Sequence, residues 1–443
     1  MPKRTPTASV VTLGCRANQY ESGAIACALE KNGFTVVSAE EKTDVCIINT
    51  CTVTAESDRK SKQMIRRAVK NAEHVIVTGC FAEVSPEDAA AIPGVDIVIS
   101  NKVKSKVVEA ARALVDSSFP VVPAAERFED CASLRCAKTE RVRAYIKIED
   151  GCDNDCAYCI IPRARGPVRS KPAKLVVEEA ETAISKGVKE IILTGIEIAR
   201  YGSDFKEDYG LIDLVRDVSK VDGLERLSLG SLDPKYLTPE IIRAFSEIGV
   251  WTRHFHLSIQ SGCSKTLKAM RRKYNAEQLA DVAGNIRKII PDAMISVDAI
   301  AGFPGESEED FNESVALLER IRPLHIHSFP YSPREGTEAA QMPFQIADGE
   351  KKRRNRILCD LSKRLNRAIL SEYVKEHEAL PVSVLCESVE DGVGTGHSEH
   401  YVQVRFPCSA DDVGKIVKVK ALGLTQGAKD IELSGAKADD TEI

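Results

Sequence analysis

Residues 143–163 read RAYIKIEDGCDNDCAYCIIPR, and this stretch decides the fold. It begins as a short strand and runs directly into Cys152, Cys156 and Cys159, at the spacing C-x3-C-x2-C. A ligand loop after a strand is typical of the carboxyl-terminal edge of a barrel or parallel sheet. Three thiolates this close suit an iron–sulfur cluster or zinc. Structural zinc normally uses close-spaced pairs of ligands, and no second pair follows, so zinc is the lesser alternative.

The residues that follow this loop alternate short strands with helices as far as residue 330. This alternation favours an open, partial TIM-type (β/α)6 barrel with its site at the carboxyl ends of the strands. The predicted strands are VRAYIKI, EIILTG, RLSLG, FHLSIQ, ISVDAIAG and HIHSFPYS, and the predicted helices cover 173–187, 209–220, 239–248, 276–290 and 307–321.

The residues before the loop, 9–115, show the same alternation and predict an open parallel α/β sheet. Three of its predicted strands end in a cysteine: VVTLGC in Cys15, CIINTC in Cys51 and VIVTGC in Cys80. Carboxyl ends of parallel strands share one edge, so we expect these three thiols to meet there. Buried, inert cysteine is the alternative for each of them.

The last part of the chain changes character twice. Residues 348–377 form one long basic helical pattern, and 382–434 switch to short strands with glycine turns, which predicts a small all-β barrel. We expect four segments, with bounds at 5–117, 118–137 (a linker), 138–373 and 374–438.

Composition limits the cellular setting. The 443 residues carry a net charge of −5 and contain no run of about 20 apolar residues, so we expect no membrane span. The N-terminus has no separate apolar segment of a secretory signal. Fourteen cysteines in such a chain favour metal binding or catalysis in the cytoplasm over disulfides.

The spacing of Cys152, Cys156 and Cys159, with Tyr158 before the last cysteine, resembles the radical S-adenosylmethionine (radical SAM) superfamily. Further stretches resemble the radical SAM methylthiotransferases, and within them the MtaB type, which acts on N6-threonylcarbamoyladenosine in tRNA. These stretches are TLGCRANQYES, NTCTVTAESDRKSKQMIRR, GCDNDCAYCIIPRARGPVRS, LTGIEI, LSIQSGCSKTLKAMRRKY, GFPGESEEDF and HSFPYSPREGTEAAQM. The resemblance covers nearly the whole chain and implies a methylthiotransferase N-terminal domain, a radical SAM core and a C-terminal TRAM domain.

The resemblance implies two [4Fe–4S] clusters as cofactors. The first, on Cys152, Cys156 and Cys159, would bind S-adenosyl-L-methionine (SAM) at its open iron and cleave it to a 5′-deoxyadenosyl radical. The second, on Cys15, Cys51 and Cys80, would carry the sulfur to be inserted. The enzyme would add sulfur and a methyl group at C2 of N6-threonylcarbamoyladenosine at tRNA position 37. Its implied partners are the tRNA anticodon loop, a reductant such as flavodoxin or ferredoxin, and a sulfur donor.

Several residues near strand ends are candidates for contacts with SAM. Glu197 is a candidate for the ammonium group, and Ser258 and Gln260 share one strand face toward the barrel mouth. Two arginines are candidates for a forked contact with the carboxylate. The full set is Tyr158, as an adenine neighbour, with Gly195, Glu197, Ser258, Gln260, Arg165 and Arg271.

The distribution of charged residues along the chain bears on whether the substrate is an RNA or a protein. Basic runs at 59–67 and 350–356 are placed where an RNA would pass, so phosphate contacts are expected there. Residues 381–443, by contrast, hold eleven acidic and six basic residues, which would suit a basic protein partner. The alternatives left open are therefore a ribosomal-protein substrate, isopentenyladenosine in tRNA, and a non-catalytic metal-binding RNA-binding module.

The cysteines outside the two triads are not expected to bind the clusters. We expect Cys27 and Cys46 in the core, Cys131 and Cys136 as unpaired surface thiols, and Cys263 on a loop that faces the site. Structural roles are expected for Cys359, Cys386 and Cys408.

Overall fold

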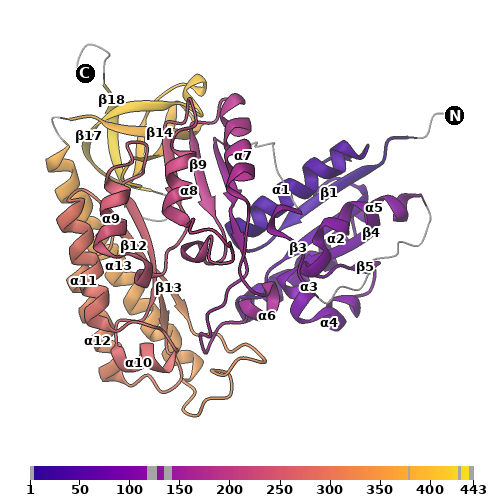
Figure 1. The fold of residues 1–443 in the computed structure, drawn as a ribbon, viewed down its shortest axis with the longest axis horizontal. Coiled ribbons are helices and arrows are strands. Elements are labelled where there is room, and N and C mark those ends of the chain that lie inside the picture. Colours follow the sequence, from indigo (N-terminus) through magenta and orange to yellow (C-terminus); the bar gives the residue numbers. More distant parts are fainter. Residues whose placement is uncertain (1–3, 117–126, 134–141, 378–379, 428–430, 439–443) are drawn as a thin grey trace.

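The computed structural model of the protein describes residues 4–116, 127–133, 142–377, 380–427 and 431–438. These residues form an N-terminal sheet domain, a central open barrel and a small C-terminal barrel (Figure 1). The predicted fold class is confirmed. None of the helices in the described ranges combines the length and apolar character needed to cross a membrane.

The N-terminal domain is a five-stranded parallel sheet of order β2-β1-β3-β4-β5. The central strand β3 is buried along its whole length, as expected for a parallel strand that is covered on both faces. Helices α1 and α5 pack on one face, and α2, α3 and α4 on the other. The elements are β1 (Thr7–Thr12), α1 (Arg16–Lys31), β2 (Thr35–Val36), β3 (Thr43–Thr50), α2 (Ala55–Ala68), β4 (Ala72–Gly79), α3 (Cys80–Val84), α4 (Pro86–Ala90), β5 (Ile97–Val98) and α5 (Val107–Val115).

The central barrel consists of two parallel three-stranded sheets, β10-β9-β6 and β11-β12-β13. Isolated bridges, Leu227 with Trp251 and Leu232 with Leu257, join the two sheets. All six strands expected from the sequence are present. Within the described residues no pairing closes β6 onto β13, so the barrel is open.

The elements of the barrel follow the expected alternation. They are β6 (Arg143–Lys147), β7 (Glu149–Asp150), α6 (Ile161–Arg165), β8 (Arg169–Ser170), α7 (Ala173–Ser185), β9 (Glu190–Thr194), α8 (Leu211–Val218), β10 (Arg226–Leu229), α9 (Pro239–Ser246), β11 (His254–Gln260), α10 (Ser264–Ala269), α11 (Ala276–Ile289), β12 (Met294–Ala301), α12 (Glu308–Ile321) and β13 (His325–Pro330).

Strand β11 shows how the barrel separates its two faces. Phe255, Leu257 and Ile259 are buried in the main core between the sheet and its helices. Phe255 lies 5.8 Å from the ring of Trp251, centroid to centroid. Because side chains alternate along a strand, the intervening polar residues of β11 point to the opposite, inner face.

The long helix α13 (Asp348–Glu376) packs along β13 and leads to the C-terminal barrel. That barrel is closed, in the order β14-β15-β16-β18-β17, and Tyr373 of α13 is buried in its core. Its strands are β14 (Val382–Glu390), β15 (Val393–Ser398), β16 (Gln403–Pro407), β17 (Ile416–Gln426) and β18 (Ile431–Lys437). The predicted domain bounds stay predictions.

The basic run that begins α13 is only partly exposed. Lys351 and Arg354 are buried, and Arg354 donates from Nη1 to Glu306 Oε2 at 2.7 Å. The Lys351 ammonium lies 5.4 Å from the ring centroid of Tyr331. The expectation is wrong for these two residues, because both are buried and Arg354 binds Glu306 of the GFPGE loop (302–306). Lys352, Arg353 and Arg356 of the same run are exposed, and their phosphate contacts stay a prediction.

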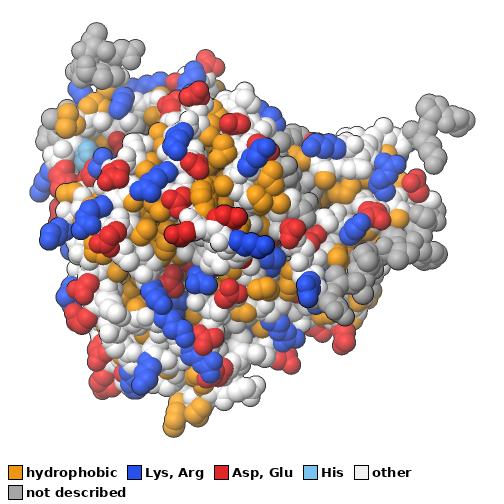
Figure 2. Space-filling model, in the orientation of Figure 1, with side chains coloured by type: hydrophobic (Ala, Val, Ile, Leu, Met, Phe, Trp, Pro, Cys, Tyr) orange, Lys and Arg blue, Asp and Glu red, His pale blue; other side chains and the backbone are white. Residues whose placement is uncertain are grey.

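The visible face carries Lys, Arg, Asp and Glu side chains interspersed, without a uniform basic field (Figure 2). This mixed pattern agrees with the small net charge of −5. On this face an RNA partner would meet only local groups of cations.

The prediction for Cys131 is also wrong, because its side chain is buried. It lies in a short 3₁₀ turn, Cys131–Ser133, within the expected linker. Cys136 lies outside the described residues.

We expect Arg354→Met to destabilise the protein by about 3 kcal/mol, because it leaves the carboxylate of Glu306 buried without a charge partner. Lys352→Met is the matched control, since Lys352 is exposed on the same helix turn. Urea unfolding followed by circular dichroism measures both. Equal midpoints for the two variants would contradict the structural role of Arg354.

Candidate functional site

The first triad, Cys152, Cys156 and Cys159, lies on the loop between β7 and α6. All three residues are half-buried. The loop starts with a sharp turn at Gly151, where φ is +89° and an added Cβ would lie 1.9 Å from the carbonyl oxygen of Pro167. Only glycine fits this position. The turn places the three thiols at the carboxyl-terminal end of the barrel.

Burial disfavours the charged form of two thiols of the first triad, Cys152 and Cys159. Burial raises the pKa of Cys152 to about 12 and the pKa of Cys159 to about 11. A metal centre binds thiolates, so it must displace these protons when it is loaded.

Arg272, which the sequence did not single out, contacts the first triad directly. Its Nη1 lies 3.3 Å from Cys156 Sγ, and its side chain is 6% exposed. Nη2 donates to Asp233 at 2.9 Å and to the carbonyl of Ser258 at 3.1 Å. The guanidinium also lies 4.9 Å from the ring centroid of Tyr274. A fixed cation beside a thiolate stabilises its negative charge.

Arg271, the arginine predicted from the sequence, points away from this group. Its side chain is 46% exposed, pairs with Glu338 and lies 3.7 Å from Asp155. Its φ of +61° turns the backbone at the end of α10, so that consecutive side chains diverge. Arg272, and not Arg271, is thus the arginine that contacts the first triad. The contact of Arg271 with SAM stays a prediction.

Glu197 supplies a carboxylate at the same end of the barrel. Its Oε2 accepts from Asn154 Nδ2 at 3.4 Å, whereas its buried Oε1 has no hydrogen-bond partner. Burial raises the pKa of Glu197 to about 7. A Cβ on Gly195 would lie 2.6 Å from Glu149 Oε2, which accepts from the N–H of Glu197 at 2.8 Å. The close turn at Gly195 thus orients Glu197, and its buried, unpartnered oxygen suits an ammonium donor.

The other candidates for SAM contacts lie around this group. Tyr158 packs half-buried against a cluster that includes Met270 and Phe303. The hydroxyl of Ser258 donates to the carbonyl of Leu232 at 3.3 Å. Gln260 has a φ of +66° and follows a register shift between β11 and β12. Their contacts with SAM stay predictions.

The second triad, Cys15, Cys51 and Cys80, lies at the carboxyl ends of the neighbouring strands β1, β3 and β4. Cys15 is the N-cap of α1 and is exposed, whereas Cys51 and Cys80 are buried. Burial raises the pKa of Cys51, and the nearby thiols of Cys80 and Cys15 raise it further. These three thiols therefore lie close together although they are dispersed in the sequence.

Glycines allow this close approach. At Gly79, where φ is +97°, an added Cβ would lie 2.4 Å from the backbone N and O of Thr50. At Gly14, where φ is +98°, it would lie 2.8 Å from the Cβ of Cys51. A side chain at either position would force the strand ends apart.

The two triads lie on adjoining surfaces of the two domains. Asn101 Nδ2 donates to the carbonyl of Ala164 in α6 at 2.9 Å and lies 3.9 Å from Cys80 Sγ. From the barrel, Arg334 Nη2 donates to Thr52 Oγ1 at 2.8 Å, one residue past Cys51. Both edges of the second triad are thus fixed to the barrel.

A buried ion cluster seals this domain contact. It consists of Glu21, Lys104, Lys147, Asp150 and Arg165. Arg165 Nη1 donates to Glu21 at 2.8 Å and to Asp150 at 2.9 Å. Burial would raise the pKa of Glu21, but Arg165, Lys104 and Lys147 hold it well below its usual range.

This cluster corrects the role expected for Arg165. Its guanidinium is committed to the domain contact, where Nη2 also donates to Asn18, and its charge lies close enough to lower the pKa of Cys80 against the larger effect of burial. Arg165 therefore belongs to the surroundings of the second triad instead of a carboxylate contact at the first.

Two further expectations for cysteines have clear outcomes. Cys263 does not face the site: it is fully buried, with Sγ 3.6 Å from Asp310 Oδ1 in α12. Cys27 and Cys46 are buried, as predicted. Cys386 and Cys408 lie together in the C-terminal barrel, with 3.8 Å between their sulfur atoms.

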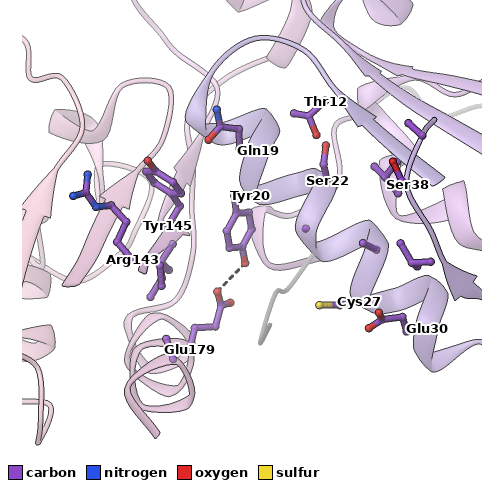
Figure 3. A pocket seen from close by; sticks show the side chains of 18 of the residues that line it. Thr12, Gln19, Tyr20, Ser22, Cys27, Glu30, Ser38, Arg143, Tyr145 and Glu179 are labelled. Atoms are coloured by element: carbon purple, nitrogen blue, oxygen red, sulfur yellow. Dashed lines mark hydrogen bonds between the residues drawn. The ribbon is translucent and has the colours of Figure 1, made fainter. Parts of the chain in front are cut away.

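A cavity of about 390 Å³ lies between α1 and the barrel elements β6 and α7 (Figure 3). In it, Tyr20 donates its hydroxyl to Glu179 Oε2 at 2.8 Å. None of the six triad cysteines lines this cavity. The candidate site therefore lies elsewhere, at the two triads.

The donor set of each triad is all sulfur, the ligand type that holds iron–sulfur clusters. Two separate sets of three thiols, one with the open oxygen of Glu197 nearby, suit two clusters.

Comparison with known proteins decides the family. Residues 146–318 match the Radical SAM superfamily, and residues 7–100 match the Uncharacterized protein family UPF0004. The Threonylcarbamoyladenosine tRNA methylthiotransferase MtaB of Bacillus subtilis (strain 168) is 38% identical over 94% of each chain. The chain belongs to the radical SAM methylthiotransferases. It is therefore an enzyme, as predicted from the sequence.

Other methylthiotransferases are similar over comparable lengths. The Thermotoga maritima protein with the same name is 37% identical over 94% of this chain and 95% of its own. The tRNA-2-methylthio-N(6)-dimethylallyladenosine synthase of Aliarcobacter butzleri is 33% identical over 94% and 96%. Among solved structures, the radical SAM methyltransferase TsrM of Kitasatospora setae is similar in fold, with a TM-score of 0.57, 15% identity and coverage of 75% and 76%.

Membership also confirms the predicted cofactors. Radical SAM methylthiotransferases use SAM and carry two [4Fe–4S] clusters. The residues that hold these groups in this chain are a proposal, which is taken up below.

We expect Arg272→Gln to lower SAM cleavage by about 100-fold, because it removes the cation beside Cys156. Arg271→Gln, the matched neighbour, should lower it no more than about twofold. Chromatographic measurement of 5′-deoxyadenosine from the reduced enzyme tests both. The assignment is wrong if Arg271→Gln has the larger effect.

Proposed function

We propose that this methylthiotransferase adds a methylthio group at C2 of N6-threonylcarbamoyladenosine at tRNA position 37. The observation that carries the proposal is the placement of two cysteine triads on adjoining surfaces, linked by Asn101 and the buried ion cluster. Two relatives named for this substrate are 38% and 37% identical, against 33% for one named for dimethylallyladenosine.

In this proposal each triad holds one cluster. Cys152, Cys156 and Cys159 bind the cluster that, once reduced, supplies the electron for SAM cleavage. Cys15, Cys51 and Cys80 bind the cluster that supplies sulfur. The protein's own groups orient the reactants: Glu197 accepts the ammonium of SAM through its open oxygen, and Arg272 fixes the charge at Cys156.

The base must reach the space between the triads. Position 37 lies in a single-stranded loop, where a base can leave its stack and enter a protein site. A tRNA substrate places the reaction in the cytoplasm, with flavodoxin or ferredoxin as the proposed type of reductant and a separate sulfur donor.

Helix α2 is the proposed phosphate-binding patch. Arg59, Lys60, Arg66 and Arg67 are exposed along it, directly after Cys51. Arg59 and Lys60 pair with Glu56, but ion pairs between exposed groups are weak and can exchange for phosphate. The buried cations of α13 are excluded from this role.

Nucleoside analysis of tRNA tests the substrate. A strain that lacks the gene should lose 2-methylthio-N6-threonylcarbamoyladenosine and regain it with the wild-type gene. Loss of the dimethylallyl derivative instead would favour isopentenyladenosine as substrate. Unchanged tRNA would favour the ribosomal-protein alternative.

A cysteine series separates the two triads. Replacing all three cysteines of the first triad with alanine should abolish SAM cleavage. The corresponding variant of the second triad should keep about half the iron and cleave SAM without inserting sulfur. Iron analysis and 5′-deoxyadenosine measurement provide the readouts. Full iron content in the second variant would remove the second cluster.

Removing two exposed cations of α2 tests the RNA patch. The double variant Arg66→Gln and Arg67→Gln should weaken tRNA binding and lower the salt slope by up to about two units, because each lost phosphate contact removes about one. Arg216→Gln on α8 is the control and should bind as the wild type does. Fluorescence anisotropy across a salt series measures this. An unchanged slope would place the RNA elsewhere.

A further inference from the structure

The inner face of the sheet β11-β12-β13 carries a group of polar side chains that the chemistry of the clusters does not use. Because the apolar residues of β11 pack outward, its histidines point inward. We name this group the histidine face; it consists of His254, His256, Asp298, His325 and His327.

The middle of the histidine face is ordered and partly open. His256 Nε2 lies 3.0 Å from Asp298 Oδ1, and both side chains are 21% exposed. The rings of His256 and His327 lie 5.0 Å apart, and His327 is exposed. Within the described residues these groups do not form a metal site. They offer hydrogen-bond donors and acceptors to a polar ligand.

One end of the face lies toward the first triad. Two residues along β11 from His256, the carbonyl of Ser258 accepts from Arg272, which contacts Cys156. A substrate that reacts near the triads could therefore extend along the sheet and place one of its polar groups on the histidine face.

The other end is closed by residues from two other domains. The ring of Tyr401, in the C-terminal barrel, stacks on His254 with 4.5 Å between centroids. Arg16, next to Cys15, donates from Nη2 to the Tyr401 hydroxyl at 3.1 Å. Its guanidinium also lies 5.8 Å from the ring centroid of Tyr145 in β6.

Arg16 places a positive charge without a paired carboxylate at the Tyr401 end of the histidine face. It is half-buried, and in the described part of the chain its contacts are with the Tyr401 hydroxyl and the Tyr145 ring, not with a carboxylate. Burial lowers the pKa of His254, and the nearby charge of Arg16 contributes, so His254 is neutral there. A partly desolvated guanidinium without an acid partner is suited to bind a carboxylate.

We propose that Arg16 and the histidine face bind the N6 substituent of the substrate nucleoside. Arg16 binds the carboxylate of the threonylcarbamoyl group, and His256 with Asp298 binds its hydroxyl and ureido groups. This inference rests on the proposed function and adds the residues that select the substrate. An apolar dimethylallyl group would leave the same side chains without partners, and a site built for hydrogen bonds discriminates strongly against such an analogue.

The test compares two synthetic anticodon stem–loops that differ only at N6 of position 37. One carries threonylcarbamoyladenosine and the other dimethylallyladenosine, and both are titrated against the cluster-loaded enzyme. The wild type should prefer the first at least 10-fold. Arg16→Gln should reduce this preference at least fivefold, while Arg16→Lys retains part of it. His256→Phe should reduce it too, and Arg216→Gln, an exposed arginine on α8, is the control.

The outcomes separate this inference from the function on which it rests. A wild type that neither prefers nor methylthiolates the threonylcarbamoyl stem–loop removes the proposed substrate itself. A wild type that does both, with a preference unchanged in Arg16→Gln and His256→Phe, overturns the role of these residues. If Arg16→Gln loses its iron, Arg16→Lys and His256→Phe serve as the test of the proposed binding role. A purely structural role would not change the ratio of the affinities for the threonylcarbamoyl and dimethylallyl stem–loops.

Discussion

The contact between the N-terminal domain and the barrel depends on one buried carboxylate, Glu21. Lys104 from its own domain and Lys147 and Arg165 from the barrel all bind it. Removing one partner of such a buried group typically costs about 3–5 kcal/mol, because the remaining charges stay desolvated. The relative position of the two cysteine triads therefore depends on charges that neither domain could bury alone.

This cluster also has a charge excess. Three cations, Lys104, Lys147 and Arg165, face two carboxylates, Glu21 and Asp150. Excess positive charge in a buried place is unfavourable unless an anion lies nearby. If the second triad holds a cluster as proposed, thiolates at Cys80 and its neighbours would supply that anion, and loading would then stabilise the contact between the domains.

Local patterns predicted most of the fold, whereas the side-chain partners within the site could not be predicted. Strand–helix alternation and the cysteines at strand ends depend on near neighbours in sequence, so they placed both triads. The divergence of the Arg271 and Arg272 side chains could not be predicted, because a left-handed φ at Arg271 leaves no mark in the letters MRRK. The partner of Arg165, Glu21, lies 144 residues away, and no periodicity reveals such a pair. The burial of Arg354 in the basic run of α13 could not be predicted either, because its acceptor, Glu306, belongs to a distant loop.

The second triad is unequal in its exposure, since Cys15 is open to solvent while Cys51 and Cys80 are enclosed. The exposed Cys15 is therefore the member of the triad that an incoming group meets first. Arg16 follows Cys15 in the chain and reaches across to Tyr401 of the C-terminal barrel. If the second triad holds a cluster and Arg16 binds the substrate, as proposed, the sulfur centre and the substrate contact are adjacent in the chain, so a change at either one would be felt by the other.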